Sequence, residues 1–136
     1  MMKQALFVIL GGGCGAVLRE LLMLGVAKLP GGFPMPIFIA NLVACFFIGV
    51  ISALSIDGGV VGRGTNLFLA TGVIGGLSTF SSFIWGTHQM LAIPAEWLTA
   101  VLYLVFSMIF GFMLVRLGLR LGEGVMQSRL VTARRS

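Results

Sequence analysis

Four long apolar runs limit what this chain can fold into. Each reaches the roughly 20 residues that a helix needs to cross the hydrocarbon core of a bilayer. Short segments rich in glycine and proline separate the runs, as is typical of turns between helices. Membrane β-strands would instead alternate apolar and polar residues over about ten positions. The pattern predicts an all-α membrane protein, a single domain with four transmembrane helices at about residues 4–27, 36–56, 66–91 and 97–122 and a basic tail at 123–136.

The composition supports the bilayer as the solvent of this chain. Of its 136 residues, 58% are hydrophobic and only 10% are charged, which is too apolar for a soluble protein to hide in its core. The net charge of +5 would suit nucleic acid, but the runs leave no soluble domain to bind it. We therefore expect no nucleic acid partner, and we expect the basic tail to meet anionic lipid headgroups.

Polar residues inside the predicted spans are the best indicators of a pathway, because burying them in hydrocarbon is costly. Asn41 stands one turn into the second span. It either bonds to another helix or lines a wet cavity. Arg19 lies near the end of the first span. Its guanidinium either extends to the interface and caps helix carbonyls, or lines a vestibule that attracts an anion.

The third run is interrupted at mid-depth by the sequence GVIGGLSTFSSF at residues 72–83. Glycine costs about 1 kcal/mol in a helix relative to alanine, so the run favours a local unwinding. Irregular backbone survives in a membrane only where it is buried in protein or faces a polar cavity. Freed carbonyls can then coordinate a cation, and freed N–H groups favour an anion. Close helix packing through small residues is the other explanation, but it accounts less well for the four hydroxyls.

Two phenylalanines in this run, Phe80 and Phe83, are three residues apart. On a helix they project from nearly the same face. The edge of an aromatic ring is electropositive, so two ring edges beside a narrow path would stabilise a small anion. Taken alone, however, such a stripe is more often ordinary packing.

Residues 72–83 resemble the third-helix signature of the Fluc (CrcB) fluoride channel family, a glycine-rich turn followed by small hydroxyl residues and Phe-Ser-x-Phe. Residues 11–19, GGGCGAVLR, resemble the start of the family's first helix. Asn41 and Leu42, with Gly49 downstream, resemble its second. The resemblance covers most of the chain in length and order.

This resemblance implies a dual-topology dimer of two four-helix subunits inserted antiparallel, with a broken third helix in each. Fluoride would leave the cytoplasm passively along the subunit interface, which reduces its toxicity. By similarity the pore or anion-binding residues would be Asn41, Phe80, Phe83, Ser81, Ser82 and Ser107. The backbone carbonyls of Gly75 and Ser78 would hold a structural sodium ion at the dimer interface. Arg19 and Thr79 would have vestibule or structural roles.

The chain also departs from the family pattern. Pro36 and Ile37 stand where the family usually has Gly-Thr before the asparagine. After Phe83 the chain reads Ile-Trp-Gly in place of the usual Ser-x-Glu. In the fourth helix Ser107 fits, but Gly111 replaces a threonine one turn later. Part of the family's polar track is therefore missing from this subunit.

The basic residues are distributed unevenly between the two ends of the predicted bundle. With four spans, both termini and residues 57–65 share one side, and this side carries Lys3, Arg63, Arg116, Arg120, Arg129, Arg134 and Arg135; the opposite side has Lys28, with Arg19 near it. Basic residues stay cytoplasmic, which predicts one orientation in the cell inner (plasma) membrane with both termini inside. An antiparallel dimer then calls for an oppositely oriented paralogue, and an identical chain inserted both ways is the competing reading.

Two other functions are compatible with a chain of four short membrane helices. A proton-coupled multidrug exporter of four short helices needs a carboxylate in mid-membrane, whereas Glu20 lies beside Arg19 near a helix end and Cys14 occupies mid-span. A non-conducting structural subunit of a heterodimeric fluoride channel is the second alternative. An enzyme is not expected, because the spans hold no pair of acids, Ser-His dyad or metal cluster that would perform chemistry.

Overall fold

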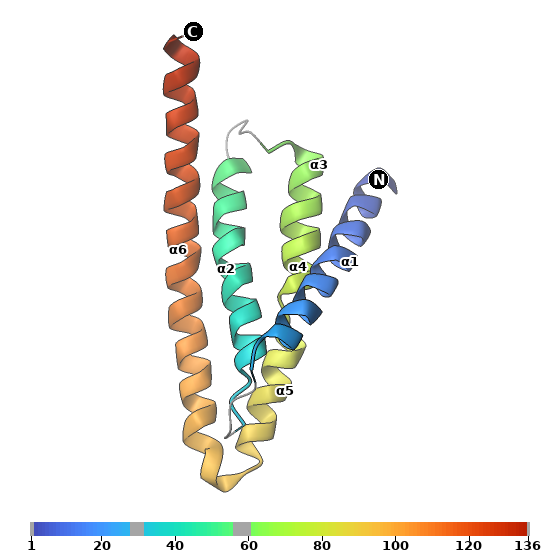
Figure 1. Cartoon of the computed structure of the whole chain (residues 1–136), viewed down its shortest axis with the longest axis vertical. Coiled ribbons are helices and arrows are strands. Elements are labelled where there is room, and N and C mark those ends of the chain that lie inside the picture. Colours follow the sequence, from blue (N-terminus) through green and yellow to red (C-terminus); the bar gives the residue numbers. More distant parts are fainter. Residues whose placement is uncertain (1, 28–31, 56–60, 136) are drawn as a thin grey trace.

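The computed structural model describes residues 2–27, 32–55 and 61–135, and the described chain is helical apart from short turns and one break. The first two spans are α1 (Met2–Gly25) and α2 (Met35–Ser55) (Figure 1). The third span consists of α3 (Arg63–Asn66), the π-helical segment η1 (Leu67–Ile74), α4 (Gly75–Leu77) and α5 (Phe80–Leu91). A single 3-10 turn, η2 (Pro94–Glu96), leads into α6 (Trp97–Arg135). Within these described ranges, four stretches are long and apolar enough to cross a membrane, which confirms the predicted all-α membrane fold with four transmembrane helices.

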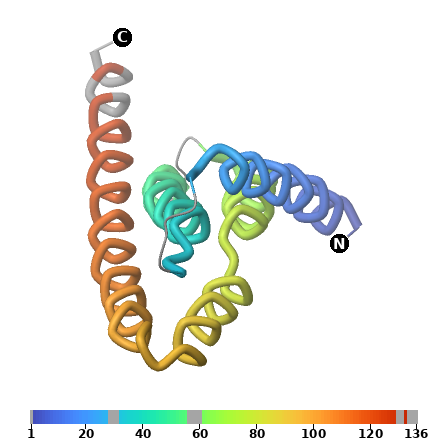
Figure 2. Tube along the Cα trace, turned by 60° about the horizontal axis from the view of Figure 1, so that its bottom comes forward, coloured from blue at the N-terminus to red at the C-terminus, as the bar shows by residue number. Residues whose placement is uncertain are grey.

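The four spans are arranged side by side, and α2 lies between α6 and the third span in both views (Figures 1 and 2). The helix α1 crosses the other side of the third span. Both chain termini lie at the end of the molecule where α2 connects to α3, and the turn from α5 to α6 lies at the opposite end. This is the arrangement that an even number of membrane crossings requires.

The last helix is longer than its apolar run. It continues through the predicted tail to Arg135, for 39 residues in all, or roughly 60 Å at 1.5 Å per residue. Hydrophobicity marks only the part of a helix that crosses lipid, whereas residues 123–135 contain good helix formers and no proline. The basic tail is therefore a helical continuation of the fourth span that projects past α2 and α3 (Figure 1).

Small residues let α2 and α6 approach closely. A Cβ placed on Gly118 of α6 would lie 3.0 Å from the backbone nitrogen of Val50 in α2. Likewise, a Cβ on Gly49 of α2 would lie 3.0 Å from the nitrogen of Leu119 in α6. Helices in lipid associate through such backbone contacts, because the bilayer provides no hydrophobic drive to bring them together.

Glycines also allow close contact between α1 and the third span. The glycines of residues 72–76 therefore serve helix packing and do not themselves form the break. A Cβ on Gly72 would lie 2.8 Å from the Cα of Gly11, and a Cβ on Gly15 would lie 2.9 Å from the nitrogen of Leu77. Gly72 lies inside η1 and Gly75 begins α4. The interruption predicted within residues 72–83 is present, but it lies after the glycines, at Ser78 and Thr79.

Candidate functional site

The backbone leaves the helix at two residues of the third span. Ser78 has a ψ of 150° and Thr79 a φ of −145° with a ψ of 107°, both extended conformations. The side chain of Asn41 in α2 replaces the helical acceptor that the Thr79 N–H loses. The Thr79 N–H donates to Asn41 Oδ1 at 2.8 Å, and Asn41 Nδ2 donates to the Thr79 carbonyl at 3.3 Å. Of the two roles left open for Asn41, bonding to another helix is therefore present.

The break frees two carbonyls that a continuous helix would occupy. In such a helix the Thr79 N–H would bond to the Gly75 carbonyl, and the Ser82 N–H to the Ser78 carbonyl. Instead the first N–H bonds to Asn41 Oδ1 and the second to Thr79 Oγ1 at 3.2 Å. Gly75 is exposed and Ser78 is half-buried. These are hard oxygen donors of the kind that suits sodium, so the residues present fit the predicted cation site.

Thr79 also caps the helix that restarts after the break. Its side chain accepts the Ser82 N–H and donates to Ser82 Oγ at 3.0 Å, while the residue itself is only 6% exposed. The first N–H groups of a helix carry partial positive charge and attract anions. Within a few residues, therefore, the break presents the carbonyl end of α4 and the N–H end of α5.

The two phenylalanines at the start of α5 are placed differently from each other. Their ring centroids are 6.2 Å apart, which agrees with the same-face prediction. Phe83 packs against Tyr103 of α6, with centroids 5.0 Å apart. Phe80 is 76% exposed and so projects away from the subunit beside the break.

An open pocket of about 460 Å³ collects most of the predicted site residues. The rest of its wall consists of apolar side chains of α2 and η1, such as Ala44 and Ile74, and Met108 of α6. Asn41 is also part of the wall of this pocket, and its role in lining a wet cavity stays a prediction. The predicted residues that line the pocket are Asn41, Gly75, Ser78, Thr79, Phe80, Phe83 and Ser107.

Three predicted residues lie outside this wall. Ser81 is exposed on α5, and its hydroxyl lies 3.4 Å from Thr79 Oγ1. Ser82 belongs to the cap described above. Arg19 is half-buried on α1 and is not among the residues around the pocket. The structure therefore groups the polar residues of α2, the break and α6 around the pocket but does not bring Arg19 to them.

The fourth span contributes a hydroxyl that is already engaged. Ser107 Oγ donates to the Tyr103 carbonyl of its own helix at 2.6 Å, a local bond that serine commonly makes inside helices. One turn later, Gly111 is buried, and a Cβ there would contact Cys45 Sγ at 3.4 Å. The position where the family usually has a threonine is thus used for packing against α2.

Tyr103 is a residue that the sequence reasoning missed. Its ring is fully buried against Phe33 and Phe83. Among the described residues, its hydroxyl is the one buried side-chain oxygen without a hydrogen-bond partner, a condition that costs about 1–3 kcal/mol. The sequence could have indicated this residue. Tyr103 is the single tyrosine of the chain and stands one helical turn before Ser107, which places the two side chains on the same face of the helix.

These features define a polytopic α-helical membrane protein in which a second helix holds open a polar break in the third. Residues 6–119 match the family described as CrcB-like protein, Camphor Resistance (CrcB). The chain belongs to the CrcB family.

Relatives across most of the chain carry a common name. A protein of Yersinia pseudotuberculosis named "Fluoride-specific ion channel FluC 3" is 44% identical over 122 residues, 90% of each chain. "Fluoride-specific ion channel FluC" of Azobacteroides pseudotrichonymphae is 36% identical over 90% of this chain and 98% of its own length. "Fluoride-specific ion channel FluC 1" of Brucella abortus is 38% identical over 90% of this chain, which spans 46% of that longer relative.

Proposed function

We propose that this chain is one subunit of a fluoride-selective passive channel that lets cytoplasmic fluoride leave across the cell inner membrane and so reduces its toxicity. The observation that carries this proposal is the break at Ser78 and Thr79, held by Asn41 beside an open pocket. The identity of the ion is inferred from the relatives, which are named fluoride-specific ion channels.

Fluoride must exchange its hydration for donors along the path. Asn41 has two amide hydrogens, and one of them is used at the Thr79 carbonyl. The other, together with the hydroxyls of Ser81 and Ser82 and the first N–H groups of α5, supplies donors. The ring edges of Phe80 and Phe83 add positive potential without a full charge. Chloride is larger and would be rejected by size.

A sodium ion between two subunits would be held by the carbonyls of Gly75 and Ser78. When bound, it would neutralise the negative end of α4 and connect the two breaks. The residues fit because both carbonyls have lost their helical donors to Asn41 and Thr79. In this proposal the ion has a structural role only.

A second subunit is needed because irregular backbone facing lipid is costly, and the break lines an open pocket whose wall includes the exposed ring of Phe80. We favour a paralogue in the opposite orientation, since the basic residues gather at the end that carries both termini. The Yersinia and Brucella relatives have numbered names, as is usual where an organism has several proteins of a kind. An identical chain inserted the other way is the alternative partner.

A specific observation favours the alternative of a non-conducting structural subunit in a heterodimeric channel. Ser107 donates to its own helix and Gly111 packs against Cys45, so this chain is short of free donors on α6. That favours a pair in which the pathway along this subunit does not conduct and its partner's does. A proton-coupled exporter is disfavoured, because no acid is among the described residues that line the pocket.

The test is fluoride efflux from liposomes that hold the purified chain, with chloride efflux as the control. Fast fluoride-selective efflux from the chain alone would establish a self-sufficient channel. Efflux that requires a paralogue from the same organism would establish the paired arrangement. Absence of efflux with every partner, in protein shown to be folded and inserted, would contradict the channel assignment.

A further inference from the structure

Two arginines lie one turn apart on an exposed face of α6. Arg116 and Arg120 are both exposed and are separated by four residues, so their side chains are neighbours on the helix surface. Like charges at this spacing destabilise a helix. Glu123 is three residues from Arg120 but seven from Arg116, so of the two arginines only Arg120 has this acid within one turn. An anion bound between the two guanidiniums would remove their repulsion.

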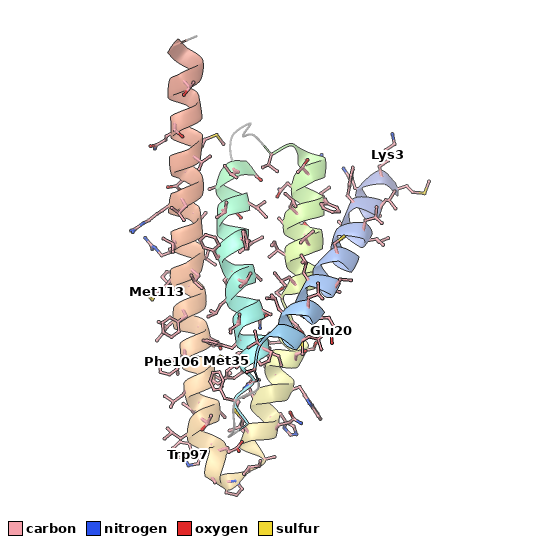
Figure 3. All side chains as sticks on the ribbon, viewed as in Figure 1. Lys3, Glu20, Met35, Trp97, Phe106 and Met113 are labelled. Carbon is pink, nitrogen blue, oxygen red and sulfur yellow. The ribbon has the colours of Figure 1, made fainter. Side chains whose placement is uncertain are left out.

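The arginines stand at the end of an apolar groove of about 500 Å³. Its apolar walls include Leu42 of α2 and Phe110, Met113 and Leu117 of α6. Met113 lies on the side of α6 that is turned away from α2 (Figure 3). The groove is therefore separate from the pocket at the break and belongs to the outer surface of the subunit.

One of the guanidiniums is held in place by an aromatic ring. The Arg116 guanidinium carbon lies 5.6 Å from the centroid of the Phe112 ring, within the range of a cation–π contact. This contact orders a long side chain that would otherwise lose conformational entropy when it bound a ligand. It leaves the planar fork of donors available for a phosphate, which arginine binds in a bidentate manner.

The depth of the arginines matches the level of lipid phosphates. Trp97 begins α6 at the end of the molecule opposite Lys3 (Figure 3), and tryptophan is enriched at membrane interfaces. At 1.5 Å per residue, Arg116 and Arg120 lie roughly 28 and 34 Å further along the helix. The hydrocarbon core is about 30 Å thick, so the two side chains bracket its other boundary.

We propose that this groove is a binding site for one anionic phospholipid. The phosphate group binds between Arg116 and Arg120, and an acyl chain lies along Phe110, Met113 and Leu117. A free phosphate would make no use of the apolar walls, and a zwitterionic headgroup would bring a cation towards the arginines. Both the charge and the shape of the site therefore select an anionic lipid.

The test is native mass spectrometry of the purified protein with equal amounts of phosphatidylglycerol and phosphatidylcholine. We expect bound phosphatidylglycerol to exceed phosphatidylcholine roughly tenfold or more. The double variant R116Q/R120Q should lose this preference. The matched control K3Q/R63Q removes two positive charges from the same end, away from the groove, and should keep it. Equal loss in both double variants, or no preference in the wild type, would overturn the site.

Two further measurements separate the parts of the proposal. Met113→Trp fills the groove but keeps both arginines, and Met113 is exposed enough to accept a larger ring; it should weaken phosphatidylglycerol binding by roughly tenfold. Unchanged binding would exclude the groove as the acyl site. Millimolar glycerol 3-phosphate should fail to displace the lipid, and full displacement would show a phosphate site without a lipid component.

Discussion

Asn41 determines the conformation of the break more than any other side chain. Its amide supplies both an acceptor and a donor to the backbone of Thr79, 38 residues away in sequence. In a membrane a backbone N–H has no water to bond with, so losing the Asn41 acceptor leaves the Thr79 N–H unpaired. The Thr79 carbonyl would keep the Phe83 N–H at 3.4 Å. The same side chain therefore links stability to the shape of the pocket.

Asn41→Ala should lower stability and abolish fluoride efflux together. It leaves the Thr79 N–H without its partner, at a cost of about 1–3 kcal/mol, and it removes one of the two donors to the Thr79 carbonyl, which keeps the Phe83 N–H at 3.4 Å. The measurements are the midpoint of thermal unfolding in detergent and the efflux rate from liposomes. Asn66→Ala, at the other asparagine of the chain, is the control and should change neither. Normal efflux from the Asn41 variant would show that the break does not depend on this amide.

Tyr103→Phe tests the role of the buried hydroxyl on the fourth span. The buried hydroxyl has no partner among the described residues, so its removal should leave the unfolding midpoint unchanged or raise it. Tyr103 does not line the pocket at the break, so the efflux rate should stay at the wild-type value. A lower unfolding midpoint would contradict the unpaired hydroxyl, and a loss of efflux with unchanged stability would place Tyr103 on the pathway.

At the scale of the elements, glycines fix how α1 meets the third span. Gly15 is buried, and a Cβ there would press on the backbone at Leu77, immediately before the break. Gly13 is exposed, and a Cβ there would meet no atom of the described chain within 4 Å. The two positions lie on the same helix and differ in what they contact.

Gly15→Ala should therefore destabilise the protein by about 1–3 kcal/mol, the usual cost of overpacking. Gly13→Ala should be neutral or should stabilise the helix by up to about 1 kcal/mol. The comparison is made by thermal unfolding of the two variants under identical detergent conditions. Equal midpoints for both would contradict the close contact between α1 and α4.

The spans were predictable because lipid imposes a length and a composition on any helix that crosses it. An interruption within residues 72–83 was predictable from its glycines and hydroxyls. Its location was not, because the glycines serve packing and the break depends on Asn41, a partner distant in sequence. The length of α6 was also not predictable from apolar residues, since a helix can continue into water.

At the scale of the whole molecule, the distribution of charge predicts a single orientation. By the order of the four spans, the end that carries both termini also carries Lys3, Arg63, Arg116 and Arg120. Lys28, which the sequence assigns to the other end, lies outside the described residues. Mapping the accessibility of tags at both termini in cells should find both in the cytoplasm. An even mixture of orientations would remove the reason for an oppositely oriented paralogue and favour a homodimer.

The central claim is that fluoride passes the ring of Phe80 beside the break, and one comparison tests it most directly. The initial rate of fluoride efflux is measured from liposomes with wild-type protein, Phe80→Ile and Phe47→Ile, the last being an exposed phenylalanine of α2 that does not line the pocket. We predict that Phe80→Ile lowers the rate by roughly tenfold or more, which corresponds to about 1.4 kcal/mol in the barrier, and that Phe47→Ile does not. Equal rates for all three proteins would contradict the proposed pathway.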